Sequence, residues 1–232
     1  MENYKIIYDE AALQDFIDNF LPDLTDDELF YVCLFARKKY MPSLVNKGKD
    51  KHQLWRNTCT KKDLVYKLRQ LEIPVGRYLM DGIEMPNDGL AIYIAPNPRS
   101  IKKACANMAQ TLVRMLATGD KFIRPNQLGL TELHRAKSRT VYVDFDFDKC
   151  DYLDKKEAID NLIGMDTPRK ILVTRGGFHL LLKPEDIPKQ YNKHWYMGLK
   201  GLDGCDDDQQ ESDIMVPIPG CIQGGFIPKF IV

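Results

Sequence analysis

The sequence predicts an α+β fold that ends in a split βαβ sheet, the ferredoxin-like arrangement also used by RNA-recognition domains. Apolar residues alternate with polar ones in short runs, as in strands with one covered face, and amphipathic stretches with helical spacing separate these runs. The expected order is a strand over 140–147, a helix over 154–164, strands over 170–175 and 178–183, a helix over 188–200 and a strand over 213–218. In this topology the first and third strands lie side by side at the sheet centre, and the fourth flanks the first.

The residues before this sheet are expected to be mainly helical. Amphipathic spacing predicts helices over 9–20 and 61–71, and a capping-box pattern, Thr25 followed by Glu28, predicts a helix over 27–40. A strand over 90–95, a turn over 96–100, a helix over 100–118 and an irregular stretch over 119–139 should follow. We therefore expect a partly basic helical region over 1–87 and a core over 88–232, together forming one compact unit.

Composition limits the class of protein but does not choose its partner. The chain has 232 residues, 44% of them hydrophobic, with 33 basic and 33 acidic side chains, so net charge argues neither for nor against nucleic acid. Its six scattered cysteines indicate reduced thiols rather than a zinc module or a disulfide framework. No signal-peptide pattern and no long apolar run appears, which predicts a soluble, cytoplasmic protein without a membrane partner, in the host cytoplasm if it is viral.

Basic residues are concentrated between residues 36 and 70, where Asp50 and Asp63 are the only acidic ones. A charge run of this kind is either a solvated surface or a contact for phosphates. Tyr40 and Trp55 lie among the cations and could stack on bases, which favours the second interpretation. With the basic residues that follow the strand over 90–95, the predicted nucleic-acid contacts are Arg56, Lys61, Lys62, Arg99, Lys102 and Lys103.

The segment VYVDFDFD, residues 141 to 148, places three aspartates on one face of a strand. Strand alternation sends Asp144, Asp146 and Asp148 to the face opposite the covering helices, and the Cα atoms of the first two should lie roughly 6 to 7 Å apart. Like charges this close cost stability unless a cation neutralises them or one carboxyl is protonated. Two Mg²⁺ or Mn²⁺ ions would satisfy this condition and suit phosphoryl or nucleotidyl transfer. The alternative is an edge strand with a solvated acidic face.

Two further segments should reach the same open face of the sheet. In TRGGFH, residues 174 to 179, Gly176 and Gly177 form a tight turn that could admit a phosphate, while Arg175 and His179 could supply positive charge. Asp213, on the last predicted strand, would add a carboxylate. A lone histidine at the start of a strand is more often structural than functional, but the predicted neighbours of His179 favour a functional role. PIPGCIQGGF, residues 217 to 226, reads as a turn that could form the floor or lid of the site and leads into a final strand.

The three segments VYVDFD (141–146), TRGGFH (174–179) and SDIMVPIPG (212–220) resemble, in order and spacing, the motifs of the archaeo-eukaryotic primase superfamily, or primase-polymerases, over roughly residues 88–230. The resemblance implies that Asp144, Asp146 and Asp213 hold the two catalytic Mg²⁺ or Mn²⁺ ions. It implies that His179, helped by Thr174, Arg175, Gly176 and Gly177, contacts the phosphates of the incoming nucleotide. Family members often carry a basic residue just before the Pro-Gly of the third segment, where this chain has Val216 and Pro217. The short core is most similar to phage and mobile-element members.

The expected activity is that of a DNA-directed primase-polymerase, which joins a nucleoside triphosphate to a 3′-hydroxyl on a DNA template and primer, with a helicase in trans as a further partner suggested by the family. A non-catalytic single-strand-binding or replication-initiator module on the same fold is the alternative, although such modules usually present aromatic rather than acidic side chains on the open face. Rolling-circle nucleases use a His-x-His pair, which the four histidines do not form. Nucleotide cyclases also use two-metal sites. The sequence favours both the cyclase and the nuclease interpretations less than the two above.

Overall fold

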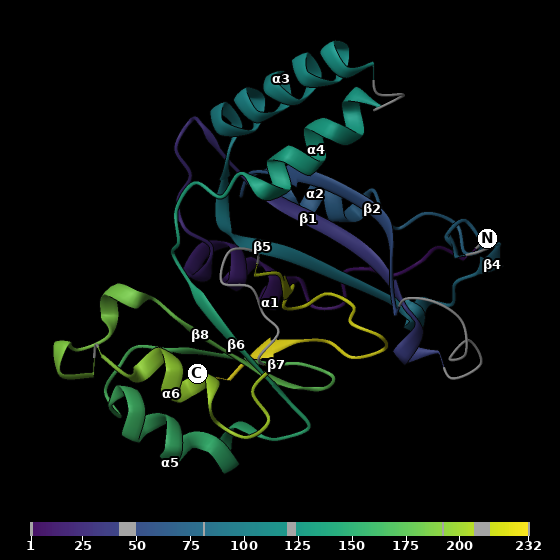
Figure 1. Cartoon of the computed structure of the whole chain (residues 1–232). Helices are drawn as coiled ribbons and strands as arrows, with labels where there is room; N and C mark the ends of the chain where they lie inside the picture. Colours follow the sequence, from purple (N-terminus) through teal and green to yellow (C-terminus); the bar gives the residue numbers. More distant parts are fainter. Residues whose placement is uncertain are drawn as a thin grey trace.

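The computed structural model describes residues 2–41, 50–80, 82–119, 124–191, 193–206 and 214–231. Within these ranges the chain is a mixed α+β protein with six α-helices, two four-stranded antiparallel sheets and a small hairpin of β3 (Leu79–Met80) and β4 (Ile83–Glu84). Figure 1 shows the two large sheets as separate layers, with α3 and α4 beside the first sheet and α5 and α6 on the far side of the second.

The first sheet has the strand order β2-β1-β5-β9. Its strands are β1 (Glu28–Arg37), β2 (Lys51–Cys59), β5 (Leu90–Ser100) and β9 (Val216–Pro217). The prediction of a helix over 27–40 is therefore wrong, and so is the expectation of a mainly helical region before residue 88. The segment ELFYVCLFAR is rich in residues that favour strands, and it is apolar at nearly every position because a central strand is covered on both faces.

The capping-box pattern is present as a local contact but does not begin a helix. The Glu28 carboxylate accepts a hydrogen bond from the Thr25 backbone N–H at 3.1 Å, and the Glu28 N–H donates to the Thr25 carbonyl at 3.0 Å. These bonds close a turn before β1. A capping box at a helix start uses the same short-range geometry, so the sequence pattern alone does not distinguish the two.

The other elements of the first half follow the predictions in part. The expected helices appear as α1 (Glu10–Asp15), continued by the π-helical η1 (Phe16–Phe20), as α2 (Leu64–Arg69) and as α3 (Ile101–Thr118). β5 continues through 96–100, where a turn was predicted, because a register shift opposite Leu29 and Tyr31 accommodates its two prolines. The stretch expected to be irregular contains α4 (Pro125–Arg135), which begins with a proline at its first position.

The second sheet has the order β10-β7-β8-β6. It consists of β6 (Val143–Asp148), β7 (Lys170–Val173), β8 (Gly177–Leu182) and β10 (Lys229–Phe230), joined by α5 (Tyr152–Ile163) and α6 (Trp195–Lys200). The predicted contact between the first and third strands of this unit, β6 and β8, is confirmed. Short 3-10 helices complete the chain: η2 (Lys38–Tyr40), η4 (Asn87–Gly89), η5 (Pro184–Asp186) and η6 (Lys189–Tyr191).

The predicted fourth strand of the second sheet lies in the first sheet instead. β9 pairs with β5, and Val216 and Ile218 are buried in the core of the first sheet. The place beside β6 is taken by residues 204–206, where the Asp206 N–H donates to the Asp146 carbonyl at 2.8 Å and the Asp148 N–H donates to the Gly204 carbonyl at 2.8 Å. A segment of alternating apolar residues can pair with a strand of either sheet, so the alternation alone does not predict which strand it pairs with.

Two large hydrophobic cores follow from this arrangement, besides two small clusters. One joins α1, η1 and α2 to the first sheet and extends to Tyr142, Leu172 and Leu181 of the second. The other fills the space between the second sheet and its helices α5 and α6, and includes Phe145 and Phe147 as predicted. We had expected the opposite face of β6 to be open to solvent. It faces the first sheet instead, although Asp148 at the end of the strand is exposed.

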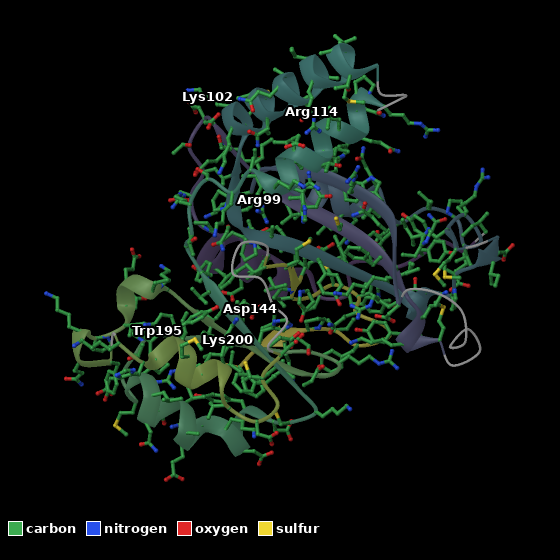
Figure 2. The ribbon with its side chains drawn as sticks, viewed as in Figure 1. Arg99, Lys102, Arg114, Asp144, Trp195 and Lys200 are labelled. Carbon is green, nitrogen blue, oxygen red and sulfur yellow. The ribbon has the colours of Figure 1, made fainter. Side chains whose placement is uncertain are left out.

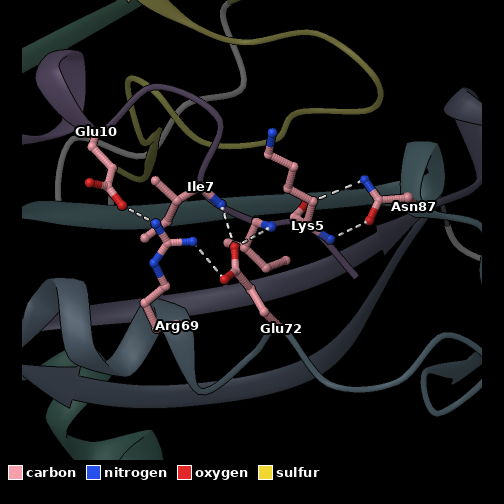
Figure 3. Close-up of polar contacts among 7 residues, drawn as sticks. Lys5, Ile7, Glu10, Arg69, Glu72 and Asn87 are labelled. Atoms are coloured by element: carbon pink, nitrogen blue, oxygen red, sulfur yellow. Dashed lines mark hydrogen bonds and ion pairs between the residues drawn. The ribbon is translucent and has the colours of Figure 1, made fainter. Parts of the chain in front are cut away.

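Polar contacts also fix the two layers and the N-terminal segment. Asn97 of β5 is 1% exposed; its amide oxygen accepts from the N–H groups of Val141 and Tyr142 at 2.8 and 2.9 Å, and its nitrogen donates to the Tyr142 carbonyl at 2.9 Å. Figure 3 shows Glu72 accepting from the Ile7 N–H at 3.1 Å and pairing with Arg69 at 2.7 Å. The described part of the chain has no helix long and apolar enough to span a bilayer.

Candidate active site

An imidazole lies between two carboxylates at the centre of the β6–β8 pair. Asp146 and His179 are register partners across the two strands. His179 Nδ1 is 2.9 Å from both carboxylate oxygens of Asp144, and His179 Nε2 is 3.6 Å from Asp146 Oδ1. The Asp144 side chain has no exposed surface, whereas that of Asp146 is 27% exposed. The predicted convergence of His179 on the aspartate face is confirmed, and Figure 2 shows Asp144 in the interior between the layers.

Electrostatics favour a protonated imidazole at this position. Burial alone lowers the pKa of His179, but the negative charges of Asp144 and Asp146 outweigh it and raise the pKa to about 9. Burial also raises the pKa of Asp146, with the positive His179 opposing this and the carboxylates of Asp144, Asp148 and Asp206 adding to it. In this structure the imidazolium therefore provides much of the charge compensation that the sequence led us to assign to metal alone.

A cavity of about 450 Å³ opens beside this pair, between the two sheets, and we call it the carboxylate cavity. Asp146, Asp148 and Asp206 line one side, together with His179. The sequence analysis did not predict Asp206 as a site residue. It belongs to a run of three aspartates, and no feature of the sequence indicates which of the three reaches the cavity. Its position beside β6 is set by the backbone bond to Asp146 described above.

The opposite side of the carboxylate cavity is basic. Arg37, Lys39 and Lys51 come from the end of β1, from η2 and from the start of β2. Arg37 is held at 2.8 Å by both Asp50 and the Tyr93 hydroxyl. Burial and the nearby charges of Arg37 and Lys39 lower the pKa of Lys51. All three cations belong to the segment that we expected to contact a template, and the structure places them opposite the aspartates.

The turn between β7 and β8 brings backbone to the edge of the cavity. The Thr174 N–H and hydroxyl both donate to the Gly177 carbonyl, at 2.9 and 3.2 Å, and Thr174 and Gly176 line the cavity. A side chain at Gly177 would overlap the Phe147 carbonyl oxygen of β6, so glycine is required for the strands to approach.

Arg175 and the segment 217–226 close the cavity floor. The Arg175 N–H donates to the Gln223 side chain at 2.9 Å, and its guanidinium lies 4.5 Å from the centre of the Tyr40 ring and donates to the Gly224 carbonyl. Gln223 itself lines the cavity, which agrees with the expected position of PIPGCIQGGF. In this arrangement Arg175 connects the turn between β7 and β8 to the segment 217–226.

The remaining predicted residues have different surroundings. Asp213 lies outside the described residues. Arg99 is only 1% exposed, so the prediction that it contacts template phosphates is wrong for this structure. Figure 2 shows Arg99 inside the fold and Lys102 at the start of α3, where the helix follows β5. Lys61 pairs with Asp23 at 3.0 Å, and Arg56 donates to the Gln127 carbonyl at 3.1 Å. The other predicted contacts, Lys62, Lys102 and Lys103, are exposed.

The carboxylate cavity offers oxygen ligands suited to a hard divalent cation. No group of three or more histidine, cysteine or acidic side chains among the described residues is arranged to enclose a metal. Mg²⁺ and Mn²⁺ sites at phosphate substrates need only one or two protein carboxylates, because water and phosphate oxygens complete the shell. Asp146 is partly exposed toward the cavity and feels the charges of Asp148 and Asp206, so these residues fit an open site of that kind.

Comparisons of this chain with protein-family models, with curated proteins and with solved structures gave no match.

Proposed function

We propose that this chain is a metal-dependent nucleotidyltransferase of the primase-polymerase type, which adds a nucleoside triphosphate to a 3′-hydroxyl on a DNA template. The observation that carries the proposal is the carboxylate cavity itself, which has three aspartates and His179 on one side and Arg37, Lys39 and Lys51 on the other. A nucleoside triphosphate with its divalent cation needs this combination, since the cation prefers carboxylates and the phosphates prefer basic groups.

Each side of the cavity has a part in the proposed reaction. Asp146, with Asp148 or Asp206 as its neighbour, binds the cations, which would stabilise charge on the α-phosphate and activate the attacking hydroxyl. Arg37, Lys39 and Lys51 bind and orient the β- and γ-phosphates, so that pyrophosphate can leave along the basic side. Asp144 holds His179 in place and favours its protonated form, so His179 can donate from Nε2 to a phosphate oxygen.

The proposal extends to the fold and to Asp213. The second sheet, with the acidic pair on β6 and His179 on β8, would be the catalytic sheet of a primase-polymerase core. The three motif-like segments of the sequence support this assignment, and the approach of the first two in space is consistent with it. Asp213 precedes Met215, which lines the carboxylate cavity, so it remains the proposed third acidic ligand.

Primer extension and dinucleotide synthesis on a DNA template, with Mn²⁺ or Mg²⁺, test the proposal. Asp146→Asn removes one of the three carboxylate charges of the cavity with little change in shape. It should lower incorporation by about 100-fold or more, the scale of a lost contact to developing charge. Asp154→Asn, an exposed change in the first turn of α5, is the matched control and should leave the rate unchanged. Circular dichroism of both variants checks that they fold.

Equal incorporation by the native chain and Asp146→Asn would overturn the assignment of this cavity. Binding of single strands that is indifferent to EDTA, with no incorporation under any condition, would instead favour the non-catalytic binding or initiator module. Formation of a cyclic nucleotide from ATP or GTP without template would point to a cyclase.

A further inference from the structure

Two more cavities continue from the carboxylate cavity along the first sheet. The next, the aromatic cavity of about 470 Å³, is lined by Tyr31, Phe35, Tyr93 and His134 and shares Lys51, Tyr93 and Met215 with the carboxylate cavity. Beyond it lies the arginine pocket of about 500 Å³, which contains Arg56, Arg114, Arg124 and Arg135 and shares Arg56 with the aromatic cavity. Shared lining residues place the three cavities next to one another in a row, which we call the path.

The arginine pocket concentrates positive charge in a chain whose net charge is zero. Its four guanidinium groups face one carboxylate, Glu132, which lies 3.7 Å from Arg135. The Arg135 side chain is 69% exposed, and Arg114 and Arg124 are exposed as well. Such an excess of guanidinium groups repels itself unless an anion enters, and planar guanidinium groups match phosphate oxygens well.

The aromatic cavity has the features of a base-stacking site. Phe35 and His134 are partly exposed and pack against the buried rings of Tyr93 and Tyr31. The ring centroids of Phe35 and Tyr93 are 5.8 Å apart in an edge contact, and those of Tyr31 and His134 are 4.5 Å apart. Bases expose their faces for stacking only when they are unpaired, so a cavity of aromatic rings beside cations fits a single strand. Arg56, at the junction of the two cavities, is fixed by its bond to the Gln127 carbonyl of α4.

We propose that a single strand of nucleic acid binds along this path, with its phosphates in the arginine pocket and its bases in the aromatic cavity, and so reaches the carboxylate cavity as the template. The role as template rests on the proposed function. The binding itself does not, because it needs neither catalysis nor a metal ion.

Fluorescence anisotropy with labelled single-stranded oligonucleotides in EDTA tests the path over a series of salt concentrations. Arg114→Ala combined with Arg124→Ala removes two phosphate contacts and should reduce the slope of log affinity against log salt by about 1.4, at about 0.7 for each contact. Phe35→Leu should weaken binding about tenfold by removing one stacking surface while leaving that slope unchanged. DNA and RNA strands are measured in parallel to show which of the two nucleic acids the path binds more tightly.

Lys189→Ala combined with Lys193→Ala is the matched control. It removes the same charge from two exposed lysines that line none of the three cavities, and should leave the slope unchanged. An equal loss of affinity in this control, or native affinity in the arginine variant, would contradict binding along this path. Tighter binding of a duplex of equal length would contradict the choice of a single strand as the ligand. Normal binding to the path without nucleotide incorporation would leave this inference standing and defeat only the proposed activity.

Discussion

Replacement of His179 by glutamine should remove a large pH dependence from the stability of the metal-free protein. His179 is 5% exposed and lies 2.9 Å from the Asp144 carboxylate, whose side chain is fully enclosed. Glutamine keeps an amide that can donate to this carboxylate but cannot take up a proton. The variant therefore isolates the contribution of the positive charge.

The size of the effect follows from the pKa of His179, which rises from 6.5 to about 9 in the fold. A difference of 2.5 units corresponds to about 3 kcal/mol of folding free energy. Because the folded pKa is the higher one, this stability is fully present below pH 6.5 and is lost as the pH rises through 9. Between about pH 6 and pH 9 the native chain should lose nearly all of it, and His179→Gln should not.

Urea unfolding in EDTA, followed by circular dichroism at intervals across this pH range, measures the difference between the two proteins. Titrating groups away from this cluster act on both proteins alike, so the gap between the native and variant curves reports the histidine together with the carboxylates that it contacts. NMR titration of the His179 ring gives its pKa directly. Parallel stability curves, or a ring that titrates near 6.5, would refute the argument that Asp144 and Asp146 hold the imidazole in its charged form.

Two further substitutions test the geometry that supports the site. Gly177→Ala should destabilise the protein by about 2 kcal/mol in urea unfolding, because the new methyl group overlaps the Phe147 carbonyl oxygen. Gly129→Ala gives the reference value, because its methyl group would meet Met108 Sδ at an ordinary contact distance of 3.6 Å and, like Gly177, it does not have a positive φ. Asn97→Ala should cost about 3 kcal/mol by leaving the buried backbone groups of Val141 and Tyr142 unpaired, and unchanged stability would show that the layers do not depend on this side chain.

Local pattern was sufficient for the strands that carry the acidic pair and His179. The alternation in VDFDFD separates phenylalanines from aspartates whatever the strand packs against, so the faces of β6 were predictable. The neighbouring position of β8 followed from the short βαβ connections. The close approach of His179 to Asp144 and Asp146 is a direct consequence of these two local facts.

Long-range pairing was beyond the reach of the same reasoning. β1 is apolar on both faces because Phe30, Val32 and Leu34 pack in the large core, while Tyr31 and Cys33 pack in a small cluster on the other face. The resulting apolar run, read without its partners, also fits a buried helix. Likewise β9 joined the first sheet and left the place beside β6 to residues 204–206. The contribution of Asp206 to the cavity depends on that exchange, which no spacing in the sequence encodes.

The site depends on both sheets, because each sheet supplies only one sign of charge. The aspartates and His179 belong to the second sheet and its edge, whereas Arg37, Lys39 and Lys51 belong to the first. The second sheet alone has an excess of carboxylates that His179 only partly compensates, and the first sheet alone has cations without a ligand for metal. Three contacts between the sheets, made by Asn97, by Arg175 with Gln223 and by the shared core at Tyr142, set the width of the cavity between them. A change that loosens these contacts should therefore abolish the proposed triphosphate binding before either sheet loses its own hydrogen bonds.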